Sequence, residues 1–325
     1  MSARYILRRL VSAGVTILLI VLLNFVLFRM MPGSPERILL GRIPNVNPAA
    51  ITATRERWGL DKPLFPDQFV SYVTSTLQGD LGFSFSMRGQ TVVEVLESRL
   101  WPTLLLFGLG EILAIIMGLV LGAYSGWKRG GVVDFLGNGV SLVLYATPYF
   151  LLGMGMLILF ATTLHWFPTF GMTTAGRDYK SIFEELGDIG RHLVLPLATV
   201  SLGLVGQYAI LMRSSILDTM TEDYVTTARA KGLTEGRILR SHALPNALLP
   251  TVSLVAINLG YVVAGAITVE VVFNWPGLGT LTVEALAARD YPVLQGIFLL
   301  LSITVVLANL IADLAYSFLD PRVRT

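Results

Sequence analysis

Residues 219–250 read TMTEDYVTTARAKGLTEGRILRSHALPNALLP, a polar and basic stretch between two long apolar runs. Each flanking run is long enough to cross a membrane, because a spanning helix needs about 20 mainly apolar residues. A polar segment with this much local structure is unusual for a simple connection between two spans. We therefore interpret it as a loop that something outside the membrane grips and through which the spans are moved.

Local signals divide this loop into two short helices. Thr221 can cap the first helix, and the carboxylates of residues 222–223 lie at the positive end of its dipole. Gly232 has the position of the left-handed residue that ends such a helix. Thr234 can cap the second helix, which Pro245 is expected to stop. Such a pair can transmit force, although a passive helix pair lying on lipid headgroups would have the same pattern.

The composition of the whole chain indicates a polytopic membrane protein. Of its 325 residues, 54% are hydrophobic and 14% are charged, and the mean hydropathy is +0.67. Soluble domains carry roughly 25% charged residues. The chain has no cysteine, which excludes disulfides and thiolate metal sites. The net charge of +2 gives no reason to expect a nucleic-acid partner.

Six segments are apolar and long enough to span a bilayer, so we expect an all-α protein with six transmembrane helices. They cover residues 10–31, 101–127, 135–164, 192–212, 248–273 and 291–319. The first follows Arg4, Arg8 and Arg9 as a signal peptide would, but it is longer than a usual signal sequence and lacks a small-residue cleavage site. We expect it to be retained.

The short loops predict the orientation, because Lys and Arg are enriched on the cytoplasmic side. With the N-terminus inside, 12 basic residues face the cytoplasm and 4 face outward. The inner ones are Arg4, Arg8, Arg9, Lys128, Arg129, Arg213, Arg229, Lys231, Arg237, Arg240, Arg322 and Arg324. The outer ones are Arg177, Lys180, Arg191 and Arg289. Both termini are therefore expected in the cytoplasm.

The expected organisation has three parts: residues 1–31 with the first span, an extracytoplasmic segment at 32–100, and a permease core at 101–325 that carries the loop at about 214–247. In the extracytoplasmic segment, the spacing of apolar residues predicts one helix near 48–58 and another after Pro66. Two interpretations stay open for it. It either caps the outer mouth of the spans or forms a docking surface for an extracytoplasmic partner.

Catalytic motifs are absent from the sequence. There is no GxxxxGK[ST] phosphate loop, no HExxH and no GxSxG, and the three histidines lie far apart. We expect no catalytic, cofactor or metal site, and an intramembrane enzyme is disfavoured. A stand-alone secondary transporter is also disfavoured, because the halves show no clear similarity.

Polar residues inside the spans are the candidates for a translocation path. Glu111 lies near the middle of the second span, where a charge is costly, and Gln207 and Asn258 are milder candidates. Each has an alternative role as an interhelical hydrogen-bonding group. Gly118 and Gly122 are expected to allow two helices to approach closely.

The loop resembles the EAA loop of ABC importer permeases, in which a glycine is followed by nine residues and then a hydrophobic-x-Leu-Pro. Here Gly232 is followed by nine residues and then by residues 242–245, His-Ala-Leu-Pro. The chain departs from the family pattern at Thr226 and Thr227, which replace the acidic residue and the first alanine, and at His242. These departures shift the expected basis of coupling from ion pairing to shape and apolar packing.

Five further blocks are similar to the B-type, first permease subunit of oligopeptide and dipeptide importers. They are Tyr5-x-x-Arg8-Arg9-Leu10, Gly59-Leu60-Asp61-Lys62-Pro63, Gly79-Asp80-Leu81-Gly82-x-Ser84, Glu270-x-x-Phe273-x-x-Pro276-Gly277-Leu278-Gly279 and Arg289-Asp290-Tyr291-Pro292-Val293. The same subunit type serves importers of nickel, glutathione and haem, so the resemblance does not choose among these substrates.

The resemblance implies a type I importer permease in the bacterial inner membrane. Its expected partners are a second permease, two separate or fused ATPase subunits that bind ATP and Mg²⁺, an extracytoplasmic binding protein and a peptide substrate. The chain itself would bind no cofactor. The residues that the resemblance assigns to ATPase coupling are Tyr224, Ala228, Gly232, Leu233, His242, Leu244 and Pro245. Among them, Ala228, Leu233 and Leu244 would pack in a groove of the ATPase.

Overall fold

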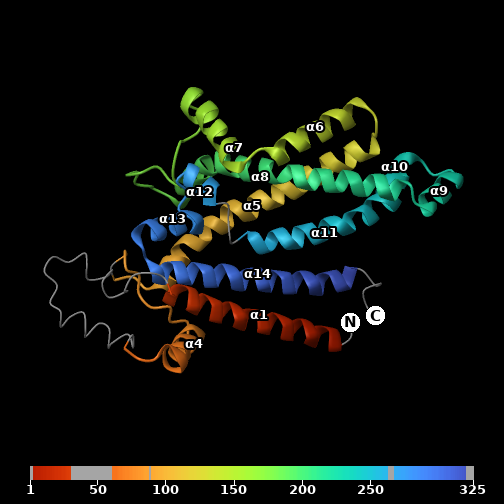
Figure 1. Ribbon diagram of the computed structural model, residues 1–325. Helices are drawn as coiled ribbons and strands as arrows, with labels where there is room; N and C mark the ends of the chain where they lie inside the picture. Colours follow the sequence, from red (N-terminus) through yellow and green to blue (C-terminus); the bar gives the residue numbers. More distant parts are fainter. Residues whose placement is uncertain (1–2, 31–60, 88, 263–266, 320–325) are drawn as a thin grey trace.

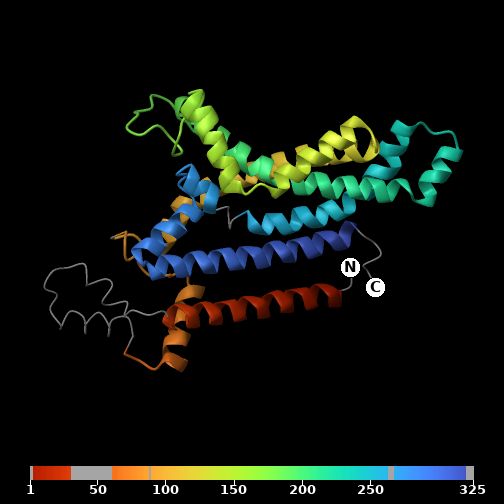
Figure 2. The ribbon, with the colours of Figure 1, turned by 45° about the horizontal axis from the view of Figure 1, so that its top comes forward.

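The computed structural model describes residues 3–30, 61–87, 89–262 and 267–319, and within these ranges every regular element is helical (Figure 1). The long helices lie side by side in a row (Figures 1 and 2). In spatial order they are α1 (Ala3–Met30), α14 (Tyr291–Leu319), α11 (Leu244–Tyr261), α8 (Ile182–Met220) with α5 (Val92–Trp127), and α6 (Val132–Ala146).

Short elements cover the two ends of this row (Figure 1). One end, which we call the α9 end, carries α9 (Asp223–Ala230), α10 (Glu235–Ile238) and the π-helical turn η3 (Leu239–Ala243). The first residue of α1 and the last of α14 lie toward this end. The opposite end, the α4 end, carries η1 (Leu64–Gln68), α4 (Phe69–Leu77), α12 (Ile267–Val272) and α13 (Leu278–Ala288).

Helices α5 and α8 pack closely along their length, and glycine makes this possible. A Cβ on Gly118 would overlap the Cβ of Tyr208, and one on Gly122 would overlap the carbonyl oxygen of Ala209. Replacing either glycine would therefore push the helices apart. The predicted packing role of Gly118 and Gly122 is confirmed.

The described residues contain fewer uninterrupted spans than the six expected. Four of its described helices are long and apolar enough to cross a membrane: α1, α5, α8 and α14. A fifth crossing results if the bent pair formed by α6 and residues 149–163 is counted as one. The expected span at 248–273 is divided between α11, which ends at Tyr261, and α12, which begins at Ile267.

The expectation of one helix over residues 135–164 is wrong. α6 ends at Ala146, and α7 (Tyr149–Met156) continues into η2 (Leu157–Thr163) at an angle of 103° to it. Thr147 has the extended backbone angle ψ of 122°. A residue before proline is pushed away from helical angles, and here Pro148 follows, so the break has a local cause.

Two helices begin well before the positions expected from apolarity. α5 begins at Val92 because Thr91 and Glu94 form a reciprocal capping box. α8 begins at Ile182, where the Ser181 side chain accepts a hydrogen bond from the Glu184 amide at 3.3 Å. Charged side chains in both first turns hid these starts from a search for apolar runs.

Within the segment 32–100, the part formed by η1 and α4 packs on α1. The ring of Phe25 contacts the rings of Phe65, Phe69 and Tyr72 at centroid distances of 5.3–5.6 Å. The expected helix after Pro66 is confirmed as α4. The helix expected near 48–58 lies outside the described residues.

Candidate functional site

The polar loop begins differently from the prediction. α8 continues to Met220, and Thr221 ends it, with its hydroxyl donating to the carbonyl oxygen of Asp218 at 2.7 Å. α9 starts at Asp223, with Glu222 in the capping position. The prediction that Thr221 caps the first loop helix is therefore wrong. The apolar face of α8 continues for two turns past the expected end of the span and carries the helix into the loop.

The predicted turn at Gly232 is confirmed. Gly232 has a φ of +78°, the left-handed conformation that glycine adopts without strain. Its amide donates to the carbonyl of Arg229 at 2.9 Å, and the amide of Leu233 donates to that of Ala228 at 3.3 Å. These two bonds form the Schellman motif, which satisfies the last carbonyls of α9.

The loop has a small hydrophobic core of its own. Val225, Ala228 and Ile238 are buried, and Met220 and Leu233 pack against them. This core joins α9 to α10 across the Gly232 turn. It also places Ala228 and Leu233 on the inside of the loop, so that Ala228, with 5% of its surface exposed, has little area left for a partner.

One ion pair bridges the two loop helices on their outer surface. Arg229 Nε lies 2.8 Å from Glu235 Oε1, and Arg229 Nη2 lies 3.3 Å from Oε2. The hydrogen bond from Arg229 lowers the pKa of Glu235, and the same bond raises the pKa of Arg229. Both side chains are about half exposed, so the pair contributes only about 0–1 kcal/mol.

Pro245 does not stop the second helix. η3 leads directly into α11, and Pro245 lies in the first turn of α11. A proline is tolerated there because it lies in the first turn of α11, directly after the π-helical turn η3, where no helical hydrogen bond requires the N–H that proline lacks. The loop and the helix of the bundle are consequently one continuous structure.

The same region is held firmly to α8. Ala243 and Ala247 are buried against Met212 and Ile216, and Leu244 packs on the edge of this cluster. Leu244 therefore contacts its own chain. The loop is fixed to α8 on one side and extends into α11 on the other.

The remaining predicted coupling residues lie nearer the surface. Tyr224 is 40% exposed, Pro245 and Gly232 are exposed, and His242 is partly buried. Partial burial raises the pKa of Tyr224, and a hydrogen bond with Asn246 of α11 lowers it by a smaller amount. Tyr224 thus links α9 to α11 and still presents a surface.

Two of the three predicted path residues come together in the bundle. The hydroxyl of Tyr208 donates to Glu111 Oε1, and Asn258 Nδ2 donates to the Tyr208 hydroxyl at 2.8 Å. The contact joins α5, α8 and α11, and both Glu111 and Tyr208 are buried. Gln207 is only partly buried, and its Nε2 has no partner in the described part of the chain. Sequence reasoning missed Tyr208.

A second buried carboxylate organises the α4 end. Glu270 of α12 is fully buried and accepts hydrogen bonds from the Thr103 hydroxyl at 2.8 Å and the Thr280 amide at 3.0 Å. A Cβ at Gly277 would overlap its carboxylate. The block Glu270 to Gly279 therefore forms a tight turn between α12 and α13, in which Glu270 caps α13 and ties it to α5.

A third buried carboxylate, Asp290, follows α13. Its Oδ2 accepts from the hydroxyls of Ser84 and Ser86, both at 2.6 Å, and from the Ser86 amide at 2.8 Å. Burial by itself raises the pKa of Asp290, but the hydrogen bonds from Ser84 and Ser86 outweigh it and leave the pKa below its usual value. Two of the sequence blocks thus meet at one side chain.

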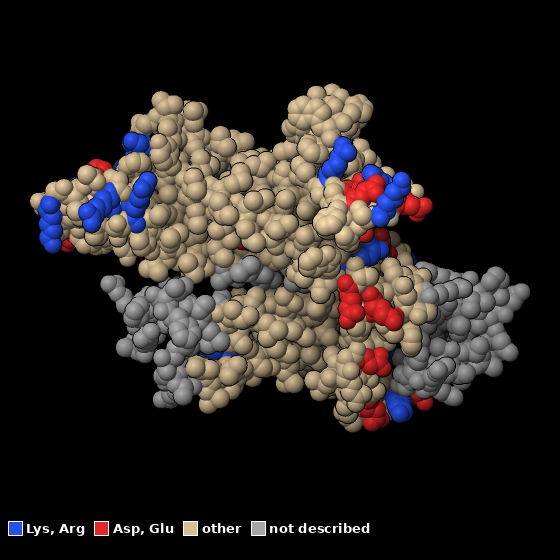
Figure 3. Space-filling model, turned by 180° about the vertical axis from the view of Figure 1, so that it is seen from behind, with Lys and Arg blue, Asp and Glu red and all other residues tan. Residues whose placement is uncertain are grey.

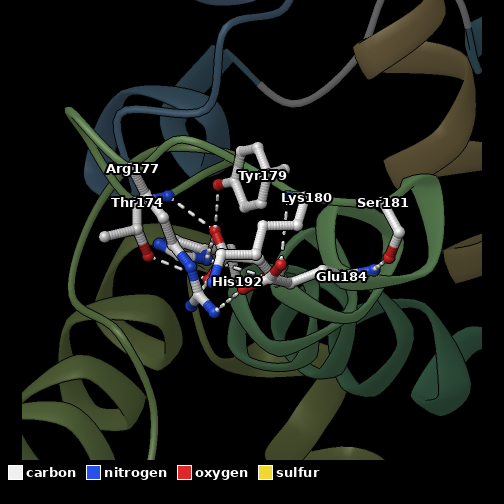
Figure 4. A network of polar contacts seen from close by, with 8 residues as sticks. Thr174, Arg177, Tyr179, Lys180, Ser181, Glu184 and His192 are labelled. Carbon is white, nitrogen blue, oxygen red and sulfur yellow. Dashed lines mark hydrogen bonds and ion pairs between the residues drawn. The ribbon is translucent and has the colours of Figure 1, made fainter.

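A polar network surrounds the α4 end of α8 (Figure 4). Asp188 accepts from the Thr174 amide at 2.6 Å, from its hydroxyl at 2.8 Å and from the Tyr179 hydroxyl at 2.7 Å. Arg177 donates to Glu184 at 2.6 Å, which raises the pKa of Arg177. The network fixes the loop before α8 to the helix. In the described ranges no group of His, Cys, Asp and Glu could hold a metal ion.

Comparisons with known proteins agree with this arrangement. Residues 118–325 match the family described as binding-protein-dependent transport system inner membrane component, and residues 2–106 match its N-terminal companion family. The chain also resembles the permease of the methionine ABC transporter MetNI in an inward-facing conformation, with a TM-score of 0.56 and 18% identity over 70% of this chain and 96% of that one. The last similarity concerns the fold.

Curated relatives span the full length. A putative peptide permease of Brucella suis is 38% identical over 99% of both chains. A probable peptide ABC transporter permease of Sinorhizobium fredii is 37% identical over 98% of this chain and 99% of its own. The glutathione transport system permease GsiC of Salmonella typhimurium is 36% identical over 98% of both. The chain belongs to the family of binding-protein-dependent transport system inner membrane components, the non-catalytic membrane subunits of ABC importers.

Proposed function

We propose that this chain is one of two permease subunits that together form the membrane path of a peptide importer. The observation that carries the proposal is its similarity, over nearly its whole length, to relatives named as peptide permeases. Two ATPase subunits would supply the energy, and a binding protein would deliver the peptide.

The proposed topology has six crossings, with both termini and the α9 end in the cytoplasm. Lys and Arg predominate at the α9 end of the surface, acidic and basic side chains mix at the α4 end, and an uncharged band lies between them (Figure 3). The bias agrees with the rule that positive loops stay inside. In this topology the bent pair is the third crossing, and α11 with α12 is the fifth.

The proposed coupling element is the loop from α9 to the start of α11. Its own core and its contact with α8 make it a rigid body that a partner can push. Tyr224, Gly232, His242 and Pro245 would face the ATPase, whereas Ala228, Leu233 and Leu244 would set the shape of the loop from within.

The proposed path runs beside the contact between Glu111 and Asn258, with Gln207 next to it on α8. The domain division into residues 1–31, 32–100 and 101–325 remains part of the proposal, as does docking of the binding protein on the segment 32–100.

Glutathione is the second candidate substrate, because several relatives named as glutathione permeases are 36% identical over 98% of this chain. The test is the full complex in vesicles, with uptake and ATP hydrolysis measured for peptides of graded length, glutathione, nickel and haem. We expect peptides to stimulate both activities. Stimulation by nickel or haem alone would overturn the proposal, and stimulation by glutathione alone would select the second candidate.

A further inference from the structure

The segment formed by η1 and α4 lies across the end of α1 instead of continuing along it (Figures 1 and 2). Three of its aromatic rings, those of Phe65, Phe69 and Tyr72, contact Phe25 of α1. The hydroxyl of Tyr72 also accepts a hydrogen bond from Asn24 Nδ2 at 3.1 Å. The segment is therefore held at the height of Asn24 and Phe25 on α1.

That height lies at the edge of the hydrocarbon layer. The apolar stretch of α1, Ile6–Arg29, has 24 residues, or about 36 Å at 1.5 Å per residue. The hydrocarbon core of a bilayer is about 30 Å thick, so a centred stretch extends about 3 Å beyond it at each end. Phe25 precedes the end of the stretch by four residues, or about 6 Å. The rings that contact it thus reach the boundary between headgroups and acyl chains.

The composition of α4 suits this depth. The helix, FVSYVTSTL, has no charged residue. Asp67 of η1 is the single charged side chain of residues 64–77 and is exposed, and Asp80 lies beyond the end of the helix. Its exposed Thr74 hydroxyl bonds to the carbonyl oxygens of Val70 and Ser71, both at 2.9 Å. The hydroxyl is therefore satisfied without water.

Four large apolar side chains of the segment remain exposed. They are Leu64 at 41%, Phe65 at 49%, Val70 at 52% and Leu77 at 82%. Helix α1 also exposes an apolar face along its length, made of Leu7, Val11, Val15, Leu18, Leu22 and Leu27. The exposed surface of the segment is thus apolar like that of α1, a helix long and apolar enough to cross a membrane.

We propose that residues 64–77 lie in the outer leaflet as an in-plane anchor, with bilayer lipid covering Leu64, Phe65, Val70 and Leu77. Amphipathic in-plane helices bury their apolar face about 5–10 Å into the interface, and tyrosine is enriched at this level. The anchor fixes the extracytoplasmic segment to the membrane surface, whatever substrate the importer carries. Its face is thereby removed from the area available to a binding protein.

The chain contains no cysteine, so single-cysteine variants label cleanly. Val70→Cys, Thr74→Cys and Leu77→Cys place an environment-sensitive fluorophore along one face, because these positions follow the spacing i, i+4, i+7. Leu18→Cys on α1 is the lipid control, and exposed Asp80→Cys is the water control. The full chain is reconstituted in phospholipid vesicles, with a spin-labelled lipid as the bilayer quencher and iodide as the aqueous quencher.

We expect the spin-labelled lipid to quench the α4 positions as strongly as Leu18, and iodide to quench them several-fold less than Asp80. Iodide quenching equal to that at Asp80 would place the helix in water and overturn the proposal. Protection from both quenchers would mean that protein covers the face, which overturns it as well. Thr74→Cys supplies a second position if Val70→Cys disturbs insertion. The readout does not depend on transport, so a wrong substrate assignment leaves the result unaffected.

Discussion

Glycine is required at position 232 because of its backbone conformation and not because of crowding around its Cα. Its φ is +78°, and a Cβ added there would meet no atom within 4 Å. Side chains disfavour left-handed angles by about 1–2 kcal/mol, and a β-branched side chain is the least tolerated. Substitution should therefore change the angle between α9 and α10 without creating a clash.

We predict that Gly232→Val inserts normally in the membrane but uncouples ATP hydrolysis from uptake. The measurement is uptake per ATP hydrolysed in the reconstituted complex. Gly236→Ala is the matched control, since Gly236 also has open space around its Cβ but is not among the residues with positive φ. Normal coupling in Gly232→Val would contradict the role assigned to the turn.

Glu270 is a buried carboxylate that accepts hydrogen bonds from two other buried groups. Glu270→Ala leaves the Thr280 amide and the Thr103 hydroxyl without their acceptor, at a cost of about 1–3 kcal/mol for each buried group. We expect a clearly lower unfolding temperature for the detergent-solubilised chain, with Glu270→Gln in between because it keeps one acceptor. An unchanged unfolding temperature in the alanine variant would show that α13 does not need this cap.

The lowered pKa of Asp290 predicts that the stability of the folded chain depends on pH. Its folded-state pKa is lowered from an ordinary value of about 3.9. The hydrogen bonds to Ser84 and Ser86 therefore contribute fully above about pH 3.9 and are lost as the pH falls through the folded-state pKa. Asp290→Asn should lose most of this pH dependence when unfolding temperatures are measured between about pH 6 and pH 3. Asp80→Asn, at an exposed turn, is the control and should leave the dependence as it is.

At the scale of the element, the loop has two candidate links between α9 and α10, the Arg229–Glu235 pair and the small core around Ile238. The two links differ in how much they contribute to the stability of the loop. The exposed pair contributes about 0–1 kcal/mol, whereas removing a buried isoleucine side chain costs about 2–5 kcal/mol. The core is therefore the stronger link.

We predict that Ile238→Ala impairs binding of the ATPase to the permease, while Arg229→Ala has little effect. Co-purification of the ATPase with each variant measures this, and protease sensitivity of the loop reports whether α9 and α10 have separated. The reverse ranking would mean that charge holds the loop together.

Local signals predicted the elements whose ends are set within one turn. Gly232 was readable because only its neighbours determine the Schellman turn, and the helix over 291–319 was readable from its apolar length. The break after Thr147 was also locally encoded by Pro148, but a long apolar run hid it. The prediction that Pro245 stops the second loop helix failed because the π-helical turn η3 before it accommodates the proline. That turn is accompanied by packing of Ala243 against α8.

The buried polar contacts could be predicted only in part, for a different reason. Glu111 and Asn258 were recognisable because polar side chains are costly inside an apolar run. Tyr208, which joins them, is an ordinary residue for a span, and its role follows from a contact between positions 97 residues apart. Glu270 and Asp290 likewise act across 167 and 206 residues, to Thr103 and Ser84.

For the whole molecule, the proposed orientation makes a direct prediction. Thr226→Cys on α9 and Asp178→Cys in the loop before α8 are both exposed and lie at opposite ends of the bundle. In intact spheroplasts an impermeant maleimide should label Asp178→Cys only, and Thr226→Cys should react after permeabilisation. Labelling in the opposite order would invert the topology, and labelling of both in intact cells would contradict membrane crossing between them.

The length of α8 has a mechanical consequence. Its 39 residues extend about 58 Å, nearly twice the thickness of the hydrocarbon core. One helix therefore reaches from the polar network around Asp188 to the start of the loop that precedes Gly232. A lever of this length that is held at one end moves the other by about 5 Å for a tilt of only about 5°. A tilt of this size is thus enough to carry the loop by about the rise of one helical turn.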